Sequence, residues 1–519
     1  MTETFVLAID QGTTGTTALV LDRRGAVRGR GYAELPQHFP KPGWVEHDPD
    51  EIWASVEAAV PRALAAAKAP RASVAAIGVT NQRETVVLWD RRTGEPVARA
   101  IVWQDRRTAA RCDALRRRHA AAIRRATGLV CDPYFSATKL EWLLAHNARA
   151  RALARAGRLA FGTVDTWLVW KLTGGAVHAT DPTNASRTML FGLRSRRWER
   201  ALLARFGVPA SVLPEVRPSS GDFGATRGLR ALPDGVPVAG VAGDQQAALF
   251  GQGCVRPGQS KNTYGTGCFL LLHTGAKPVM SRAGLLTTVA CGPRGEAAYA
   301  LEGSVFIAGA AIQWLRDGLG ILHDAAQSET LARSVPDSGG VVLVPAFAGL
   351  GAPWWRSDVR GALTGITRGT TRAHVARAAL ESLAFQSLDL VEAMARDAGA
   401  RLTALQVDGG ATQNDLLMQM QADLLGVPVR RPRVVETTAL GAGMLAGLAT
   451  GYWKSPRELD HARRLEREFR PKRSAAWRRH EIARWRAALE TLLGRGPVSR
   501  SPAASGSVPA TRARARGRR

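Results

Sequence analysis

A glycine- and threonine-rich turn between two apolar segments constrains this chain more than any other feature. Residues 6–9 and 18–21 are short apolar runs that predict two strands folded back on one another. Gly12 and Gly15 permit a tight bend that exposes backbone amides, and four threonines add hydroxyl donors, which together suit a phosphate. Asp10 would repel a phosphate unless a divalent cation lies between them. The alternative interpretation is an ordinary polar hairpin turn.

The second half of the chain repeats this plan. Residues 260–273 again read as strand, Gly-Thr-Gly turn and strand, with Thr266 in the place of Thr13 or Thr14. Residues 405–411 form another apolar strand that ends in an acid and glycines, followed by a helix over residues 414–425. Strands that alternate with helices predict α/β layers. Two like-folded domains facing each other, with a boundary near residue 250, are therefore expected, although G-T-G turns are common enough for the repeat to be coincidence.

Polar clusters follow the predicted strands directly. Residues 81–84 follow the strand at 74–80, and Asp244 follows the strand at 238–243. Open α/β sheets place their ligands at these strand ends. An aspartate such as Asp244 can take a proton from a substrate hydroxyl in phosphoryl transfer, or it can simply cap the helix that follows. Residues 441–444, Gly-Ala-Gly-Met, predict a small-residue helix packed closely against another element.

Composition excludes several classes of protein. No apolar run approaches the roughly 18 residues of a membrane span, and residues 1–10 show no export signal, which favours a cytoplasmic protein. The five cysteines and ten histidines have no metal-ligand spacing. P-loop, protein-kinase and G-x-S-x-G motifs are absent. The net charge of +27 comes from arginines spread over predicted helices, without a nucleic-acid module, so a solvated basic surface is favoured over nucleic-acid binding. Residues 495–519 predict a disordered basic tail.

Residues 5 to about 470 resemble the FGGY carbohydrate kinase family, and in particular its glycerol kinases. The matching blocks stand in the family's order and include AIDQGTT, PGWVEHDP, TNQRET, AIVWQ, TGLVCDPYFSATK, FGTVDTWL, TNASRTML, AGDQQAALFGQ, KNTYGTGCF, VPAFAGLGAPWW and TALGAG. The family's two signatures correspond to residues 134–146 and 361–381. The resemblance implies an actin-like ATPase fold, in which two ribonuclease-H-like domains face each other across a cleft. Residues 1–250 would form the glycerol and phosphate side, and residues 251–494 the nucleotide side.

The resemblance also implies an activity, namely the phosphorylation of glycerol to sn-glycerol 3-phosphate by ATP with Mg²⁺. Family members are commonly dimers or tetramers, so a homo-oligomer is expected. The nearest alternative is another polyol or sugar kinase of the family, similar to xylulokinase or erythritol kinase. A different class of alternative is a non-catalytic protein that uses the cleft as a nucleotide-gated switch.

Site residues follow from the resemblance by position. Asp244 would be the general base and Asp10 would help to hold Mg²⁺. The residues expected to contact glycerol are Arg83, Glu84, Tyr134, Asp244 and Gln245, with Trp103 and Phe269 over its carbon edge. The residues expected to contact ATP or ADP are Thr13, Thr14, Gly15, Thr266, Gly309, Gln313, Gly410 and Asn414.

Six of these residues also have a structural alternative. Arg83 and Glu84 are compatible with a surface ion pair, and Tyr134 and Trp103 with core packing, whereas Gln313 and Asn414 are compatible with helix-surface amides. One position departs from the family. Many members have an arginine or lysine shortly after the first turn, and this chain has Thr16 and Thr17 there, whose hydroxyls are the available donors.

Overall fold

A computed structural model describes residues 3–356, 358–399 and 401–494 of the protein, and the predicted tail over residues 495–519 lies outside this range. Its first half is built on one twisted sheet. Among the described residues this sheet has five strands, in the order β11 (Val238–Gly243), β5 (Val74–Asn81), β1 (Phe5–Gln11), β2 (Gly15–Leu21) and β3 (Val27–Glu34). β1 is antiparallel to β2 and parallel to β5, and β5 is parallel to β11. The predicted hairpin is therefore the centre of the sheet.

The second half contains a larger sheet with the same central topology. Its described strands run in the order β14 (Leu286–Cys291), β15 (Ala297–Val305), β13 (Cys268–Gly275), β12 (Ser260–Tyr264), β18 (Leu405–Asp408), β19 (Val429–Pro432) and β20 (Leu465–Phe469). β12 corresponds to β1, because it is antiparallel to the next strand and parallel to β18. The predicted repeat is confirmed as a repeat of topology.

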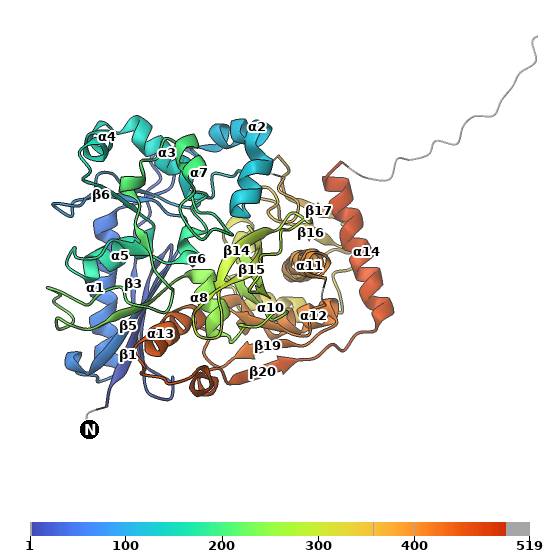
Figure 1. Ribbon diagram of the computed structural model, residues 1–519. Helices are drawn as coiled ribbons and strands as arrows, with labels where there is room; N and C mark the ends of the chain where they lie inside the picture. Colours follow the sequence, from blue (N-terminus) through green and yellow to red (C-terminus); the bar gives the residue numbers. More distant parts are fainter. Residues whose placement is uncertain (1–2, 357, 400, 495–519) are drawn as a thin grey trace, which may run out of the picture.

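Alternating side chains bury both faces of β1. Leu7 and Ile9 pack with α1 (Pro49–Ala66) and α5 (Val164–Leu172), while Val6 and Ala8 pack with α13 (Thr437–Ala449). α13 comes from the C-terminal part of the chain, and Figure 1 shows it, in orange, beside the blue strands β1 and β5. The two halves of the chain are thus interleaved at this helix rather than simply joined end to end.

α13 also crosses α8 (Asp244–Gly251) at very short range. A Cβ on Gly441 would lie 1.9 Å from the carbonyl oxygen of Ala247, and a Cβ on Gly251 would lie 2.2 Å from that of Thr437. Only glycine permits this approach of two backbones. The prediction that residues 441–444 form a closely packed small-residue helix is confirmed, and its partners are α8 and β5.

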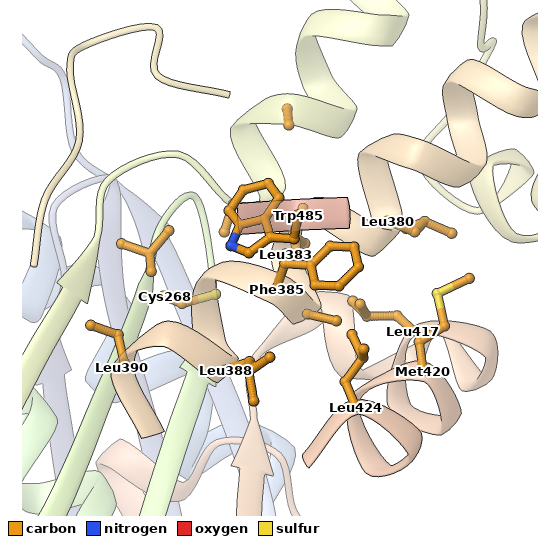
Figure 2. Close-up of a cluster of buried hydrophobic side chains, with 14 of the residues drawn as sticks. Cys268, Leu380, Leu383, Phe385, Leu388, Leu390, Leu417, Met420, Leu424 and Trp485 are labelled. Atoms are coloured by element: carbon orange, nitrogen blue, oxygen red, sulfur yellow. The ribbon is translucent and has the colours of Figure 1, made fainter. Parts of the chain in front are cut away.

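The second half has its own apolar core around α11 (Arg372–Ala398), which packs against α12 (Asp415–Leu425). Figure 2 shows Trp485 of α14 (Ala475–Leu492) lying against Phe385 of α11, with Leu417 and Leu424 of α12 nearby. The two rings are stacked, with centroids 5.2 Å apart, and the Trp485 indole donates to the Asp389 carboxylate. This core keeps α11 and α12 fixed beside β12 and β18.

Smaller elements complete the described chain. The remaining α-helices are α2 (Ala109–Thr127), α3 (Ser136–His146), α4 (Ala148–Arg155), α6 (Pro182–Ala185), α7 (Arg200–Arg205), α9 (Gly309–Gln313) and α10 (Gln327–Arg333). The remaining strands pair in twos and are β4 (Glu46–His47), β6 (Val87–Asp90), β7 (Ala100–Ile101), β8 (Leu159–Gly162), β9 (Ala179–Thr180), β10 (Glu215–Val216), β16 (Val342–Val344) and β17 (Ala362–Thr364). Within residues 3–494, leaving out 357 and 400, none of the helices has the length and apolar character of a membrane span.

Candidate active site

The parallel strands β1, β5 and β11 bring the predicted chemistry to one edge of the first sheet. In register, Asp10 lies beside Thr80 on β5, and Gly243 at the end of β11 lies beside Asn81. Asp10, Arg83 and Asp244 therefore leave neighbouring strands at the same carboxyl edge. The helix α8 begins at Asp244 with Gly243 as its N-cap, and the Asp244 carboxylate accepts from the Gln245 amide while facing Arg83. Asp244 is therefore the first residue of α8, and the helix has no side-chain cap, so the Asp244 carboxylate can also contact Arg83.

Arg83 is the most fully paired side chain of this edge, with an exposed fraction of 2 %. Its Nε lies 3.1 Å from an oxygen of Asp244, and its Nη1 donates to Gln246 at 3.1 Å. Nη1 and Nη2 also donate to the two oxygens of Glu302, each at 2.8 Å, and Nη2 makes a longer contact of 3.4 Å with the Tyr134 hydroxyl. Arg83, Glu84 and Glu302 are buried and Asp244 is half-buried, so a surface ion pair is excluded for Arg83.

Glu84 occupies an unusual backbone conformation next to Arg83. Its φ is +65°, in the left-handed region that side chains other than glycine rarely adopt. The Glu84 carboxylate accepts from the Nε of Arg187 at 2.5 Å, and its carbonyl accepts from the hydroxyl of Ser136. These contacts hold a strained backbone in place, as is common at functional sites.

Aromatic rings from both halves enclose the space beside these charges. Trp103 lies edge to face with Tyr134 at 5.6 Å between centroids, and with Phe269 of β13 at 6.3 Å. The Trp103 indole donates to the Thr13 hydroxyl at 2.9 Å, so the ring also touches the first turn. Tyr134 is buried against Phe135 and the guanidinium of Arg187, where it belongs to the core as well as to the site.

The carboxyl group of Asp10 lies in an environment that disfavours its charge. Burial, together with the nearby charges of Asp244 and Asp408, raises the pKa of Asp10 to about 8. One oxygen of Asp408 has no hydrogen-bond partner among the described residues. A divalent cation beside Asp10 would stabilise the charged form of Asp10 and give the unpaired oxygen of Asp408 a partner, since hard cations take carboxylate oxygens. The described residues contain no group of three or more metal-ligating side chains, so such a cation would need oxygens from a phosphate or water.

The first turn is closed by a hydrogen bond from the Gly12 amide to the Gly15 carbonyl. Thr14 is exposed on it, whereas Gly15 is buried with no room for a side chain, because a Cβ would lie 2.6 Å from the Ala33 carbonyl oxygen. Thr17 pairs in register with Asp10, which places it beside the carboxylate. Thr16 is not available to a ligand: it is buried and bonded to the Ser55 hydroxyl at 2.6 Å, and Ser55 donates to Ile52.

A cavity of about 470 Å³ opens in the second half, between the turn after β12 and the helices α9, α10, α11 and α12. Five of the residues expected on the nucleotide side line it, namely Thr266, Gly309, Gln313, Gly410 and Asn414. Gly309 lies against the turn, since a Cβ there would come within 2.6 Å of the Gly265 carbonyl oxygen, and Gly410 faces open space. Asn414 also caps α12 by accepting from the Leu417 amide, and Gln313 is exposed.

Gln245 connects the two halves. Its side-chain oxygen accepts from the ammonium of Lys261 on β12 at 2.5 Å, and Lys261 also donates to Thr263. Burial lowers the pKa of Lys261 to about 8, although the carboxylates of Asp408 and Asp244 oppose this shift. Lys261 therefore ties Gln245 to the central strand of the second sheet.

Sequence reasoning missed four residues of this constellation, namely Arg187, Gln246, Lys261 and Glu302. Three of them stand inside motif blocks, TNASRTML, AGDQQAALFGQ and KNTYGTGCF, where a search for charged or amide side chains would have found them. Glu302 stands in the middle of β15 and is 219 residues from Arg83 in sequence, so no local signal points to it.

Comparison with known proteins agrees with this geometry. Residues 5–251 match the N-terminal domain of the FGGY family of carbohydrate kinases, and residues 260–450 match its C-terminal domain. The chain is 61 % identical to the glycerol kinase of Trichlorobacter lovleyi over 468 residues, which cover 90 % of this chain and 94 % of that protein. It is 59 % identical to the glycerol kinase of Aromatoleum aromaticum, over 94 % of this chain and 99 % of that protein.

A solved structure gives the same result in three dimensions. The crystal structure of Plasmodium falciparum glycerol kinase with ADP superposes with a TM-score of 0.88 at 35 % identity, covering 95 % of this chain and 98 % of that one. The two matched domains together span most of the residues that the structure describes. The expected actin-like architecture is confirmed, and the chain belongs to the FGGY family of carbohydrate kinases.

Proposed function

We propose that the protein is a glycerol kinase, which transfers the terminal phosphoryl group of ATP to glycerol and forms sn-glycerol 3-phosphate. The observation that carries this proposal is the identity of 59–61 % with curated glycerol kinases over 90 % or more of the chain. The buried cluster around Arg83 and Glu84 supports it, because glycerol is small and almost wholly polar and has to be recognised by hydrogen bonds.

In this proposal residues 1–250 carry the glycerol and phosphate side, and residues 251–494 the nucleotide side. Glu84 accepts from the glycerol hydroxyls, and Arg83 donates to them in place of its long contact with Tyr134. Gln245 contributes its amide group. The rings of Trp103 and Phe269 cover the carbon edge and leave only the hydroxyls to select the substrate.

Asp244 then acts as the general base. Its half-buried carboxylate takes the proton from the terminal hydroxyl while that oxygen bonds to the γ-phosphorus, and the bond from phosphorus to the bridging oxygen of ADP breaks. Thr13, Thr14 and Gly15 donate to phosphate oxygens from the first turn, and Thr266 does so from the second. The adenosine end occupies the cavity lined by Gly309, Gln313, Gly410 and Asn414.

Mg²⁺ fits the carboxylate of Asp10, which is buried beside two further acids. When bound there with ATP, it would neutralise the charge of the phosphates. The residues of this chain hold the two substrates in line and exclude water, whereas charge neutralisation would come from Mg²⁺. A cytoplasmic location and a homo-oligomeric assembly are part of the same proposal.

A coupled assay of ADP release with glycerol, erythritol and xylulose tests the proposal. We expect kcat/KM for glycerol to exceed the other two by at least about tenfold, which corresponds to about 1.4 kcal/mol. The product should be a substrate for an enzyme specific for sn-glycerol 3-phosphate, and chelation of Mg²⁺ should abolish the reaction. A tenfold preference for xylulose or erythritol would favour the sugar-kinase alternative. ATP binding without turnover on any of the three would favour the nucleotide-gated switch.

A further inference from the structure

We propose that Glu302 is a positioning residue for glycerol, which acts through Arg83 and makes the glycerol pocket depend on both halves of the molecule. This inference rests on the proposed function. Arg83 comes from the loop after β5 in the first half, whereas Glu302 stands on β15 in the second half. Their contact has two hydrogen bonds of 2.8 Å, in the fork-to-fork geometry that fixes both the place and the plane of a guanidinium.

The backbone of Glu302 is held on both sides. In register it lies between Leu271 of β13 and Leu286 of β14, in the antiparallel part of the second sheet. Its side chain has no exposed surface. A carboxylate on a strand paired on both sides has little freedom to move, so it provides a fixed point against which Arg83 is oriented.

A second arginine extends the arrangement to Glu84. The Nη1 of Arg187 lies 3.2 Å from Glu302, while its Nε donates to Glu84. Arg83, Glu302, Arg187 and Glu84 thus alternate in charge, and each has an exposed fraction of 2 % or less. Burial alone would raise the pKa of Glu302, but Arg187 and Arg83 outweigh it and lower this pKa to about 2. Glu302 is therefore ionised at neutral pH, beside both arginines.

Gln246 supports the same geometry from another direction. It accepts from Arg83 and donates to the Thr288 hydroxyl and the Val289 carbonyl of β14, at 3.1 and 3.2 Å. Arg83 is consequently held by the second sheet at two points. A movement of the second half relative to the first would either displace the Arg83 side chain from Asp244 or break its contact with Glu302. In this inference the position of the second half therefore affects how well glycerol is bound.

The test compares Glu302→Gln, Glu302→Asp and wild type in steady-state kinetics. Glu302→Gln keeps the shape but removes the charge, and Glu302→Asp keeps the charge but shortens the reach, so it serves as the variant expected to fold if the glutamine variant does not. For each variant we expect a rise of about tenfold or more in KM for glycerol, with KM for ATP within about twofold of wild type. A wild-type KM for glycerol in a folded variant would overturn the inference.

Glu381→Gln is the matched control. Glu381 is also buried and paired with two arginines, Arg377 and Arg484, but it lies on α11 within the second half. Its substitution should lower thermal stability and leave KM for glycerol unchanged. If Glu381→Gln raises KM for glycerol as much as Glu302→Gln does, the effect of Glu302 is general destabilisation and the inference fails.

A double-mutant cycle separates positioning from a general structural role. If Glu302 acts through Arg83, then Glu302→Gln should change KM for glycerol by less than about threefold when Arg83 is already lysine, since the two-point contact is gone. Equal effects in both backgrounds would overturn the inference. Wild type that turns over glycerol in these assays confirms the proposed function whatever the variants do, whereas wild type that does not act on glycerol overturns both.

Discussion

The side proposed to bind glycerol and the side proposed to bind the nucleotide are built from different kinds of residue. The first is a cluster of four buried, alternating charges, Arg83, Glu84, Arg187 and Glu302. The second is a cavity lined mainly by glycine, alanine, leucine and isoleucine, and among its described lining residues Glu329 is the one carboxylate and there is no cation. Glu329 is itself engaged, by Arg333 and by the first amides of α12.

This contrast agrees with the chemistry of the two proposed ligands. A triol has little apolar surface, so its affinity and selectivity have to come from polar groups that are already oriented, and leaving such groups unpaired is costly. A nucleotide has a large flat base, for which an apolar cavity and backbone donors are sufficient. Substitutions on the first side should therefore act through charge and protonation, and those on the second side through shape.

The largest effect should come from Asp244→Asn. An amide cannot take the proton of the glycerol hydroxyl, so we expect kcat to fall by about 10²–10⁴-fold, with a change in KM for glycerol of only a few fold. ADP release under saturating substrates measures it. Asp389→Asn is the control for the loss of a buried carboxyl, because Asp389 lies in the core of the second half, bonded to Trp485. A kcat within tenfold of wild type would show that Asp244 is not the base.

The next effect tests whether the nucleotide side depends on shape alone. Gly410 lines the cavity, and a Cβ there would meet no protein atom within 4 Å. Gly410→Val should therefore fold normally but obstruct the ligand, and raise KM for ATP by about 10–100-fold with KM for glycerol within about twofold. Gly369→Val is the control, because a Cβ on Gly369 would make only an ordinary contact, at 3.9 Å from the Thr367 hydroxyl. An equal rise in both KM values would contradict a separation of the two sides.

A smaller effect concerns the boundary between the two sides, where Asp10 lies. Because its pKa is raised to about 8 in the folded protein, the folded state holds this proton more tightly than the unfolded state, whose pKa is near 3.8. The contribution of Asp10 to stability is therefore full below about pH 4, is lost as the pH rises towards 8 and is constant above that. Asp10→Asn removes this loss.

We accordingly expect Asp10→Asn to be more stable than wild type without Mg²⁺ and nucleotide, by about 1 kcal/mol or more at pH 8 and by little at pH 4. Denaturant unfolding of both proteins at several pH values measures the difference. The same variant should lose Mg²⁺-dependent activity. Parallel stability curves for the two proteins would show that the Asp10 carboxyl has an ordinary pKa.

Features that depend on residues close together in the sequence were predictable, and contacts between distant segments were not. The glycine turns, the acids at strand ends and the helix beginning near Asp244 are visible because each depends on a few neighbouring residues. The structure brings Asp10, Arg83 and Asp244 to one edge of the first sheet. The interruption between α3 and α4 at Asn147, whose side chain caps α4, was not anticipated. The partnership of Arg83 with Glu302 was also missed, because it forms only when two sheets built from distant segments meet.

The smallest effect concerns a contact within the first half, between the proposed glycerol pocket and the phosphate turn. Trp103 packs against Tyr134 and Phe269 around the proposed glycerol pocket, and its indole N–H donates to Thr13 in the first turn. Trp103→Phe keeps an aromatic ring and removes this hydrogen bond, which contributes about 0.5–1.5 kcal/mol. If Trp103 serves only the glycerol pocket, KM for glycerol alone should rise. If it also holds the turn in place, kcat should fall by about 2–10-fold with little change in KM for glycerol, and this second result is the one we expect. Trp198→Phe removes a comparable N–H bond to the Pro214 carbonyl outside the site and should leave both parameters unchanged.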